Sequence, residues 1–191
     1  MHAKHQVLFI QGGGKGVHSD WDSKLVHSLR QELGDGYQVH YPRMPHEDEP
    51  KYTSWQKALE KEIEKLPDGV ILVAHSVGGT ILLKALTEHA APRKLAGIFL
   101  LSVPFVGDGG WSADELKFPT HFAARLPRGV PIHFYQGLTD ETTPPSHVDL
   151  YARALPQAHV HRLKGRDHQL NNDLSETAAA ISALPTVTVT P

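Results

Sequence analysis

The stretch Ile71-Leu-Val-Ala-His-Ser-Val-Gly-Gly-Thr-Ile-Leu-Leu-Lys-Ala-Leu86 joins two apolar segments through a short polar turn. Residues 70–74 are apolar and rich in β-branched side chains, which is typical of a buried parallel strand. Residues 80–86 carry apolar side chains that suit a helix packed on that strand. The turn between them, Ala74-His-Ser-Val-Gly78, places a serine between small residues two positions before and two positions after it.

Ser76 on this turn matches the nucleophile elbow, in which crowded backbones require small residues on both sides of the serine. The usual motif is Gly-x-Ser-x-Gly, and Ala74 replaces its first glycine here. The amides at the N-terminus of the following helix are aimed at the site where negative charge would develop. An ordinary strand-to-helix turn with a capping serine is the alternative interpretation.

Length and composition favour one domain over residues 1–191. The chain is 40% hydrophobic and 21% charged, and its formal net charge is −2. It contains no Lys or Arg run that would favour nucleic-acid binding, and no apolar stretch of membrane-spanning length. The absence of cysteine excludes disulfides, thiolate catalysis and cysteine-ligated metals. Because no signal-peptide region is recognised near Met1, we expect a cytoplasmic protein.

Alternating apolar strands and amphipathic helices predict a mostly parallel six-stranded sheet with helices on both faces. The strands are expected at 7–10, 37–41, 70–74, 95–101, 130–136 and 158–163. The helices are expected at about 19–33, 53–66, 80–86, 146–155 and 174–184. Ser19 or Asp20 is expected to cap the first helix, and residues 186–191 are expected to form a loose tail. The core-facing stripes are Leu25, Val26, Leu29 and Leu33 in the first helix, and Trp55, Leu59, Ile63 and Leu66 in the second.

A glycine loop, residues 11–16, follows the first strand. A Walker loop requires Ser or Thr after Gly-Lys, whereas Gly16 follows Lys15 here. The dinucleotide fingerprint counted from Gly12 requires Gly or Ala at the position of Val17. Both nucleotide-binding motifs are therefore out of register, and we expect no cofactor.

The glycine loop has two remaining interpretations. Its glycines could simply allow a tight turn between a strand and a helix. Alternatively, the amide of Gly13, or of its neighbour Gly12, faces the elbow and forms an oxyanion hole together with the amide of Val77.

Three polar residues follow three different strands in the order nucleophile, acid, base. Ser76 follows the third strand, Asp140 the fifth and His168 the sixth. Because chemistry in such sheets gathers outside the carboxyl ends of the strands, we expect these side chains to meet. Their order is that of the α/β-hydrolase triad. In such a triad the histidine removes the serine proton during attack, and the carboxylate fixes the imidazole tautomer.

Each member of this set has a competing interpretation. Asp140 could begin the turn of the next helix, and Glu141 is a neighbouring carboxylate. His168 is one of 14 histidines, and its place in a Gly-x-x-His turn after the last strand favours it. Asp167 is interpreted as solvated, and His75 as packing or hydrogen-bonding beneath the elbow rather than serving as the base.

A metal site is a further alternative. His159 and His161 alternate on one strand and therefore share a face, and His168 could complete a three-histidine set. No His-Glu-x-x-His helix or other fuller ligand motif accompanies them, so we expect no metal.

Residues 104–128 form a long segment rich in glycine, proline and aromatic residues. Such a segment is usually functional, and we expect a short lid or rim over the site. Its aromatic residues, Phe105, Trp111, Phe118 and Phe122, suggest an apolar pocket. The candidate substrate contacts are Gly12, His75, Phe105 and Trp111. The alternative is a surface excursion packed by its own aromatic side chains.

With these motifs the chain resembles the small serine hydrolases of the retinoblastoma-binding-protein-9 type, compact members of the α/β-hydrolase superfamily. The resemblance extends from Phe9-Ile-Gln-Gly-Gly-Gly14 to Asp167-His-Gln169 and includes the elbow and the Gly137-Leu-Thr-Asp140 turn. It also includes Trp21 and Trp55, near the starts of the first two helices.

The resemblance implies a compact α/β-hydrolase fold with Ser76 as nucleophile, Asp140 as orienting acid and His168 as base. We expect a serine hydrolase that cleaves an ester, thioester or small amide of a small-molecule or short peptide substrate through an acyl-enzyme. An interaction protein that keeps the hydrolase scaffold with little turnover is the alternative. Serine at the nucleophile position disfavours dehalogenases, which use Asp there, and dienelactone-hydrolase-type enzymes, which use Cys. The oligomeric state is left open by the sequence.

Overall fold

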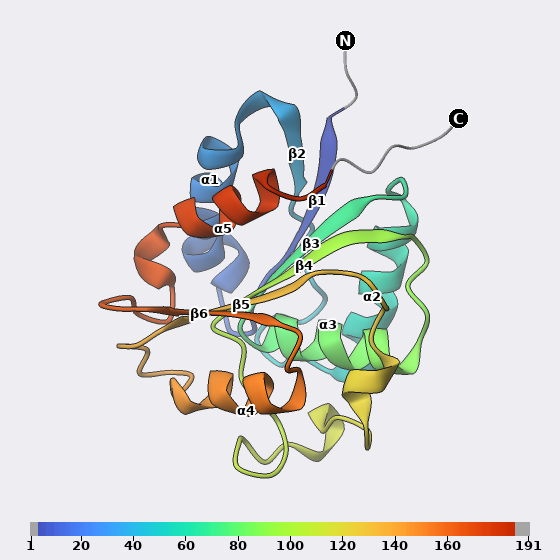
Figure 1. The fold of residues 1–191 in the computed structure, drawn as a ribbon, viewed down its shortest axis with the longest axis vertical. Helices are drawn as coiled ribbons and strands as arrows, with labels where there is room; N and C mark the ends of the chain where they lie inside the picture. The colour runs from blue at the N-terminus through green and yellow to red at the C-terminus, as the bar shows by residue number, and fades with distance from the viewer. Residues whose placement is uncertain (1–3, 186–191) are drawn as a thin grey trace.

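The computed structural model describes residues 4–185 and contains six parallel strands between two layers of helices (Figure 1). The strand order is β2-β1-β3-β4-β5-β6, and all neighbouring strands are parallel. The predicted α/β fold is therefore confirmed. The strands are β1 (His5–Ile10), β2 (Tyr37–His40), β3 (Val70–His75), β4 (Leu95–Leu101), β5 (Ile132–Gly137) and β6 (His159–Leu163). The loose tail predicted at 186–191 lies outside the described residues.

Five α-helices cover the two faces of the sheet in the described part of the chain. In Figure 1, α1 and α5 lie on one face, and α2, α3 and α4 lie on the other. Side chains of successive residues in a strand point to opposite faces, so each helical layer packs on its own set of strand residues. The helices are α1 (Asp22–Leu33), α2 (Tyr52–Glu64), α3 (Val77–Glu88), α4 (Ser146–Ala154) and α5 (Ser175–Ser182).

Strand β1 illustrates why the central strands are apolar throughout. Val7 and Phe9 pack in the hydrophobic cluster that includes α1 and α5, whereas Leu8 and Ile10 pack in the cluster that includes α2, α3 and α4. All four side chains are buried. The two predicted helical stripes, 25–33 and 55–66, are buried in these clusters as expected from their spacing.

The start of the first helix differs from the prediction. A π-helical turn, Val17–Trp21, follows Gly16 directly, and α1 begins only at Asp22. Gly16 has a φ of 76°, which glycine adopts easily, so the chain is already helical when it reaches Ser19 and Asp20. Neither side chain caps a helix, and the cap prediction is wrong.

Helix α3 is longer than predicted because it includes Gly78 and Gly79, which have low intrinsic helix propensity. A Cβ atom on Gly78 would lie 2.0 Å from the backbone oxygen of Gln11, and one on Gly79 would lie 2.3 Å from a methyl carbon of Val103. These glycines let the helix pack closely against the loops that follow β1 and β4. Tertiary packing therefore overrides local propensity at the start of α3.

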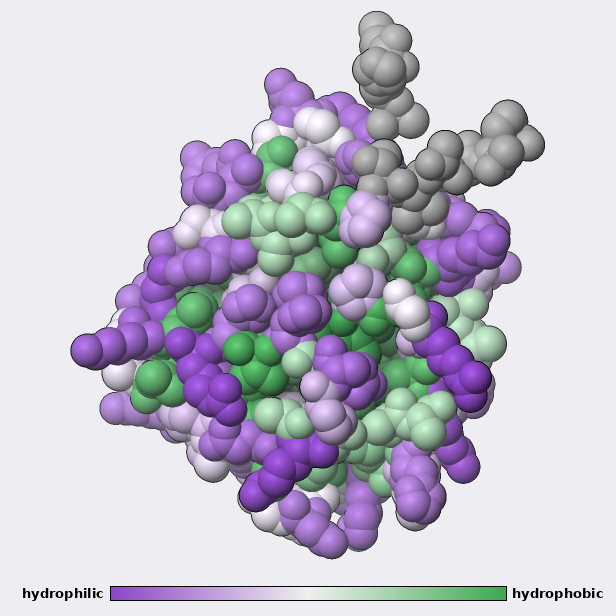
Figure 2. Space-filling model, viewed as in Figure 1, coloured by the Kyte–Doolittle hydropathy of each residue, from purple (hydrophilic) through white to green (hydrophobic). Residues whose placement is uncertain are grey.

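No helix within residues 4–185 has the length and apolar character needed to cross a bilayer. On the face seen in Figure 2, hydrophilic residues dominate the margin, and hydrophobic residues show between polar ones nearer the centre. Scattered exposed apolar residues of this kind are normal on a folded protein.

Gly78→Ala tests the contact between α3 and the loop after β1. The new methyl group would collide with the Gln11 carbonyl, so we expect the free energy of unfolding to fall by about 2 kcal/mol or more. Urea denaturation followed by circular dichroism measures this change. Gly36→Ala is the matched control, because a Cβ there meets no atom within 4 Å. Equal stability of the two variants would contradict the close approach.

Candidate active site

Ser76, His168 and Asp140 form one hydrogen-bonded row at the carboxyl ends of β3, β6 and β5. The hydroxyl of Ser76 lies 3.1 Å from Nε2 of His168. Nδ1 of His168 lies 2.9 Å from Oδ2 of Asp140. The structure thus brings together the three residues that the order of the motifs predicts.

Ser76 occupies a backbone conformation that L-residues rarely adopt, with φ 52° and ψ −136°. Strain of this kind costs about 1–3 kcal/mol and persists only where the surroundings enforce it. The amide of Ser76 donates to the carbonyl of Leu101, and the amide of Gly79 donates to the carbonyl of Ser76, each at 2.9 Å. The turn therefore holds the Ser76 side chain outside the carboxyl edge of the sheet, as an elbow does.

Asp140 is buried, and four donors converge on its carboxylate. Burial opposes ionisation, but the hydrogen bond and charge of His168, together with two backbone amides, outweigh it and lower the pKa of Asp140. An ionised acceptor at this position keeps the Nδ1 proton on His168 and leaves Nε2 free to accept from Ser76. The donors are the amides of Thr142 and Thr143, the side-chain amide of Gln136 and the ring of His168.

The structure separates the two glycine-loop candidates for an oxyanion hole. The amide of Gly12 donates to Oδ2 of Asp22 at 2.7 Å, so it is already committed. The amides of Gly13 and Val77 donate to no acceptor within residues 4–185. The two residues also lie close together, since a Cβ on Gly13 would lie 2.8 Å from Cγ1 of Val77. In the described residues, Gly13 and Val77 thus offer a pair of free amides beside Ser76.

His75 lies beneath the elbow, in the place expected from the sequence, and is 1% exposed. Its Nδ1 contacts the carboxylate of Asp22, and its Nε2 lies 3.0 Å from the backbone oxygen of His168. Burial opposes a charge on this ring, but Asp22 outweighs it and raises the pKa of His75. His75 also borders the cavity described below.

Asp22 is the member of this site that sequence reasoning missed. An acid at the start of the helix expected at 19–33 would suit the helix N-terminus in solvent, but the side chain of Asp22 is fully buried. The helical period does contain a signal. Asp22 precedes Leu25 and Val26 by three and four residues, which places it on the same core-facing stripe. An acid on an otherwise apolar stripe indicates a buried partner.

An open cavity of about 1020 Å³ lies beside the row of Ser76, His168 and Asp140, and both Ser76 and His168 line it. Its apolar walls include Trp21, Trp111 and Leu116. Its acidic lining residues are Asp48, Glu141 and Asp167. The predicted contacts Gly12, His75 and Trp111 all line this cavity.

Phe105 does not line the cavity, contrary to the expectation from its sequence. It packs instead in an aromatic cluster with ring-centroid distances of 5.1 to 6.4 Å. The alternative of a segment packed by its own aromatic side chains therefore describes this part of 104–128 better. The partners of Phe105 are Phe118, Phe122 and Tyr151.

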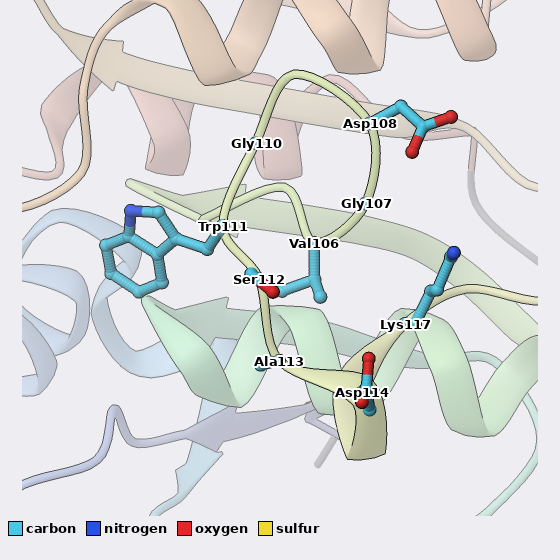
Figure 3. A pocket seen from close by; sticks show the side chains of 9 residues that line it. All are labelled: Val106, Gly107, Asp108, Gly110, Trp111, Ser112, Ala113, Asp114 and Lys117. Atoms are coloured by element: carbon cyan, nitrogen blue, oxygen red, sulfur yellow. The ribbon is translucent and has the colours of Figure 1, made fainter.

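Trp111 lies at the rim of the cavity, and His147 of α4 contacts both its indole and the backbone at Phe105. Figure 3 shows the loop 106–117, in which the indole of Trp111 points away from Asp114 and Lys117. His147 of α4 packs edge-to-face on this indole at 5.7 Å and accepts the Phe105 amide proton at Nδ1. Burial lowers the pKa of His147, which favours the neutral ring that can accept this bond.

The histidines of the sixth strand do not join His168. His161 instead lies 3.1 Å from His133 of β5, measured between ring nitrogens. In the described residues no group of three or more His, Asp or Glu side chains is arranged to hold a metal ion.

Comparison with known proteins adds a family and a set of related folds. A family model described as “Alpha/beta hydrolase family” matches residues 7–190. A Bacillus subtilis (strain 168) protein named “Putative hydrolase YdeN” is 31% identical over 97 residues, which is 51% of this chain. In this match the chain spans about half of that relative's length (50%).

Solved structures share the fold at low sequence identity. The ydeN gene product from B. subtilis has a TM-score of 0.75 and 20% identity, covering 94% of this chain and 98% of the other. A serine hydrolase involved in carbazole degradation, the CarC enzyme, has a TM-score of 0.70 and 14% identity. The match covers 94% of this chain and 90% of that protein. At such identities the likeness concerns the fold alone.

Acid should destabilise the wild-type protein more steeply than Asp140→Asn. The folded-state pKa of Asp140 is lowered, so its stabilising contribution is present above the unfolded-state value of 3.8 and is lost as the pH falls through the lowered value. Urea denaturation at intervals from about pH 5 to about pH 3 measures the slope. Asp35→Asn, at an exposed carboxylate, should keep the wild-type slope. Parallel curves for wild type and Asp140→Asn would contradict the assignment.

Proposed function

This chain belongs to the alpha/beta hydrolase family, and from that membership we propose that it is a serine hydrolase cleaving an ester, thioester or small amide through an acyl-enzyme. The observation that carries the proposal is the hydrogen-bonded row from Ser76 through His168 to Asp140. Family membership gives a hydrolase, and the row supplies a nucleophile, a base and an orienting acid for the serine mechanism.

Acylation begins when Oγ of Ser76 attacks the carbonyl carbon of the substrate and Nε2 of His168 takes the hydroxyl proton. The tetrahedral intermediate places its negative oxygen against the amides of Gly13 and Val77. When the intermediate collapses, the bond to the leaving group breaks, and His168 returns the proton to the departing alcohol, thiol or amine. Asp140 stays ionised and stabilises the imidazolium formed between these steps.

Deacylation repeats the same steps with water as the nucleophile. His168 removes a proton from water, which attacks the acyl carbon bound to Ser76. The carboxylic acid leaves as the proton returns to the serine oxygen. The amide of Val77 opens helix α3, so the partial positive charge of the helix N-terminus adds to oxyanion stabilisation in both halves of the reaction.

The cavity supports an uncharged or cationic substrate with an apolar group. Trp21 and Trp111 remain 54% and 38% exposed, so their rings offer apolar surface to a substrate. None of the described residues that line the cavity is Lys or Arg, whereas three are acidic. A negative charge on the substrate would therefore meet repulsion from three carboxylates and find no Lys or Arg side chain among the lining residues.

Subfamily and cell compartment are also part of the proposal. The resemblance to the retinoblastoma-binding-protein-9 type rests on the glycine loop, the elbow at 74–78 and the turns at 137–140 and 165–168. We also propose a cytoplasmic location.

A fluorophosphonate probe should label Ser76, because the probe requires a serine activated by its base. We expect Ser76→Ala to abolish labelling and His168→Ala to lower turnover of a nitrophenyl ester by about 10³-fold or more. Gel fluorescence and peptide mass spectrometry identify the labelled residue. Ser112→Ala, at an exposed serine beside Trp111, is the control and should label normally. Labelling that survives in Ser76→Ala would reject the serine mechanism, and absence of labelling in the wild type would favour a binding protein.

The acidic lining should select against anionic esters. We expect kcat/KM for a neutral nitrophenyl ester to exceed that for a carboxylate-bearing ester of equal length by about tenfold at low salt, and less at high salt. The double variant Asp48→Asn, Glu141→Gln should narrow this ratio. Glu32→Gln, at an exposed acid on α1 outside the cavity, should leave it unchanged. Faster turnover of the anionic ester would contradict the proposed substrate class.

A further inference from the structure

We propose that Asp22 and His75 form a buried ion pair that positions the histidine loop and the glycine loop against Ser76. The inference rests on the proposed serine mechanism, but neither residue belongs to the reacting row. Asp22 and His75 are therefore positioning residues that act through His168 and Gly13.

The carboxylate of Asp22 joins three segments that are far apart in the sequence. Its Oδ2 accepts the amide proton of Gly12 at 2.7 Å, and its Oδ1 lies 2.9 Å from Nδ1 of His75. Oδ1 also accepts from the side-chain amide of Gln169 at 3.3 Å. These partners belong to the loop after β1, the end of β3 and the loop after β6. One side chain of α1 thus connects the three segments that surround Ser76.

His75 continues this connection to the catalytic histidine. Its Nδ1 faces the Asp22 carboxylate, and its Nε2 lies 3.0 Å from the backbone oxygen of His168. The ionised carboxylate of Asp22, whose pKa is lowered, and the backbone oxygen of His168 can only accept, so each ring nitrogen of His75 donates a proton to its partner. The contacts therefore select the imidazolium form of His75. His168 is then held at two points, through its carbonyl by His75 and through its ring by Asp140.

Charge and burial agree with this ion pair. Asp22 is 0% exposed and His75 is 1% exposed, so neither charge could persist there without the other. Burial opposes both charges, but His75 lowers the pKa of Asp22, and Asp22 raises the pKa of His75. The other titratable groups facing His75 are Asp140, whose charge also favours the imidazolium, and the ring of His168, whose centroid is 4.9 Å away.

The bond to Gly12 connects the pair to the proposed oxyanion hole. Because the Gly12 amide is fixed on Asp22, the next peptide, with the amide of Gly13, is presented beside Val77. Loss of the carboxylate would release both the base loop and the oxyanion loop. Misplacement by about 1 Å can reduce turnover by about 10²-fold, and it acts on the chemical step more than on substrate binding.

Steady-state kinetics of Asp22 variants test the proposal. In Asp22→Asn the new side chain can still accept from Gly12 and donate to a neutral His75, so we expect kcat to fall by about tenfold or less. In Asp22→Ala we expect a fall of about 10²-fold, with KM within about threefold of wild type. Asp20→Ala removes an exposed acid two residues earlier and should match the wild type. Wild-type kcat in both Asp22 variants, or a loss confined to KM, would overturn the proposal.

Nitrogen NMR of histidine-labelled protein tests the ion pair without using activity. We expect the ring of His75 to keep both protons at pH values where exposed histidines are neutral, and to lose one in Asp22→Asn. A neutral His75 ring in the wild type near pH 7 would overturn the proposal, even if Asp22→Ala proved too unstable for kinetics. A wild type that is not labelled by fluorophosphonate but keeps the doubly protonated His75 would reject the serine mechanism and retain the ion pair.

Discussion

The approach of Gly78 to the carbonyl of Gln11 is the contact on which the arrangement of the site depends. A Cβ at that position would lie 2.0 Å from the carbonyl oxygen, so the first turn of α3 can sit against the loop after β1 only with glycine there. This approach brings Val77 beside Gly13, and it accompanies the left-handed conformation of Ser76. The position of the nucleophile and the positions of the two free amides are thus consequences of one steric constraint.

Two buried carboxylates serve different purposes around this turn. Donors from its own loop and from His168 lower the pKa of Asp140 and so keep it ionised. Asp140 in turn fixes the proton on Nδ1 of the reacting ring. Asp22 comes from the start of α1, and its donors come from the loop after β1, the end of β3 and the loop after β6. A local cluster of amides can lower the pKa of one acid. A carboxylate with partners on three segments fixes the positions of those segments relative to one another. Both carboxylates are buried at the same edge of the sheet, which keeps their hydrogen bonds away from competing water.

The sequence allowed much of this to be predicted, because the strands and helices show strong periodicity and the reacting residues follow strands directly. Ser76, Asp140 and His168 could be found since the ends of parallel strands meet at one edge. Contacts between side chains distant in sequence were harder to predict. Asp22 looked like a helix-terminal acid, and only its spacing from Leu25 indicated burial. Phe105 could not be placed, because composition does not tell which aromatic side chains of an irregular segment turn inward.

The departure from the elbow motif at position 74 has a simple physical explanation. Ala74 lies in β3, paired in register with Ile10 and Leu100, and its methyl group is fully buried in the core cluster on the α3 side. The position before the turn thus accommodates a methyl group, whereas the position after it, Gly78, faces a backbone carbonyl that cannot move aside. The two small residues of the motif carry unequal constraints in this chain. The geometry of the turn requires the glycine at position 78, which this chain keeps. At position 74 the chain has alanine instead of glycine, and its methyl group adds apolar packing.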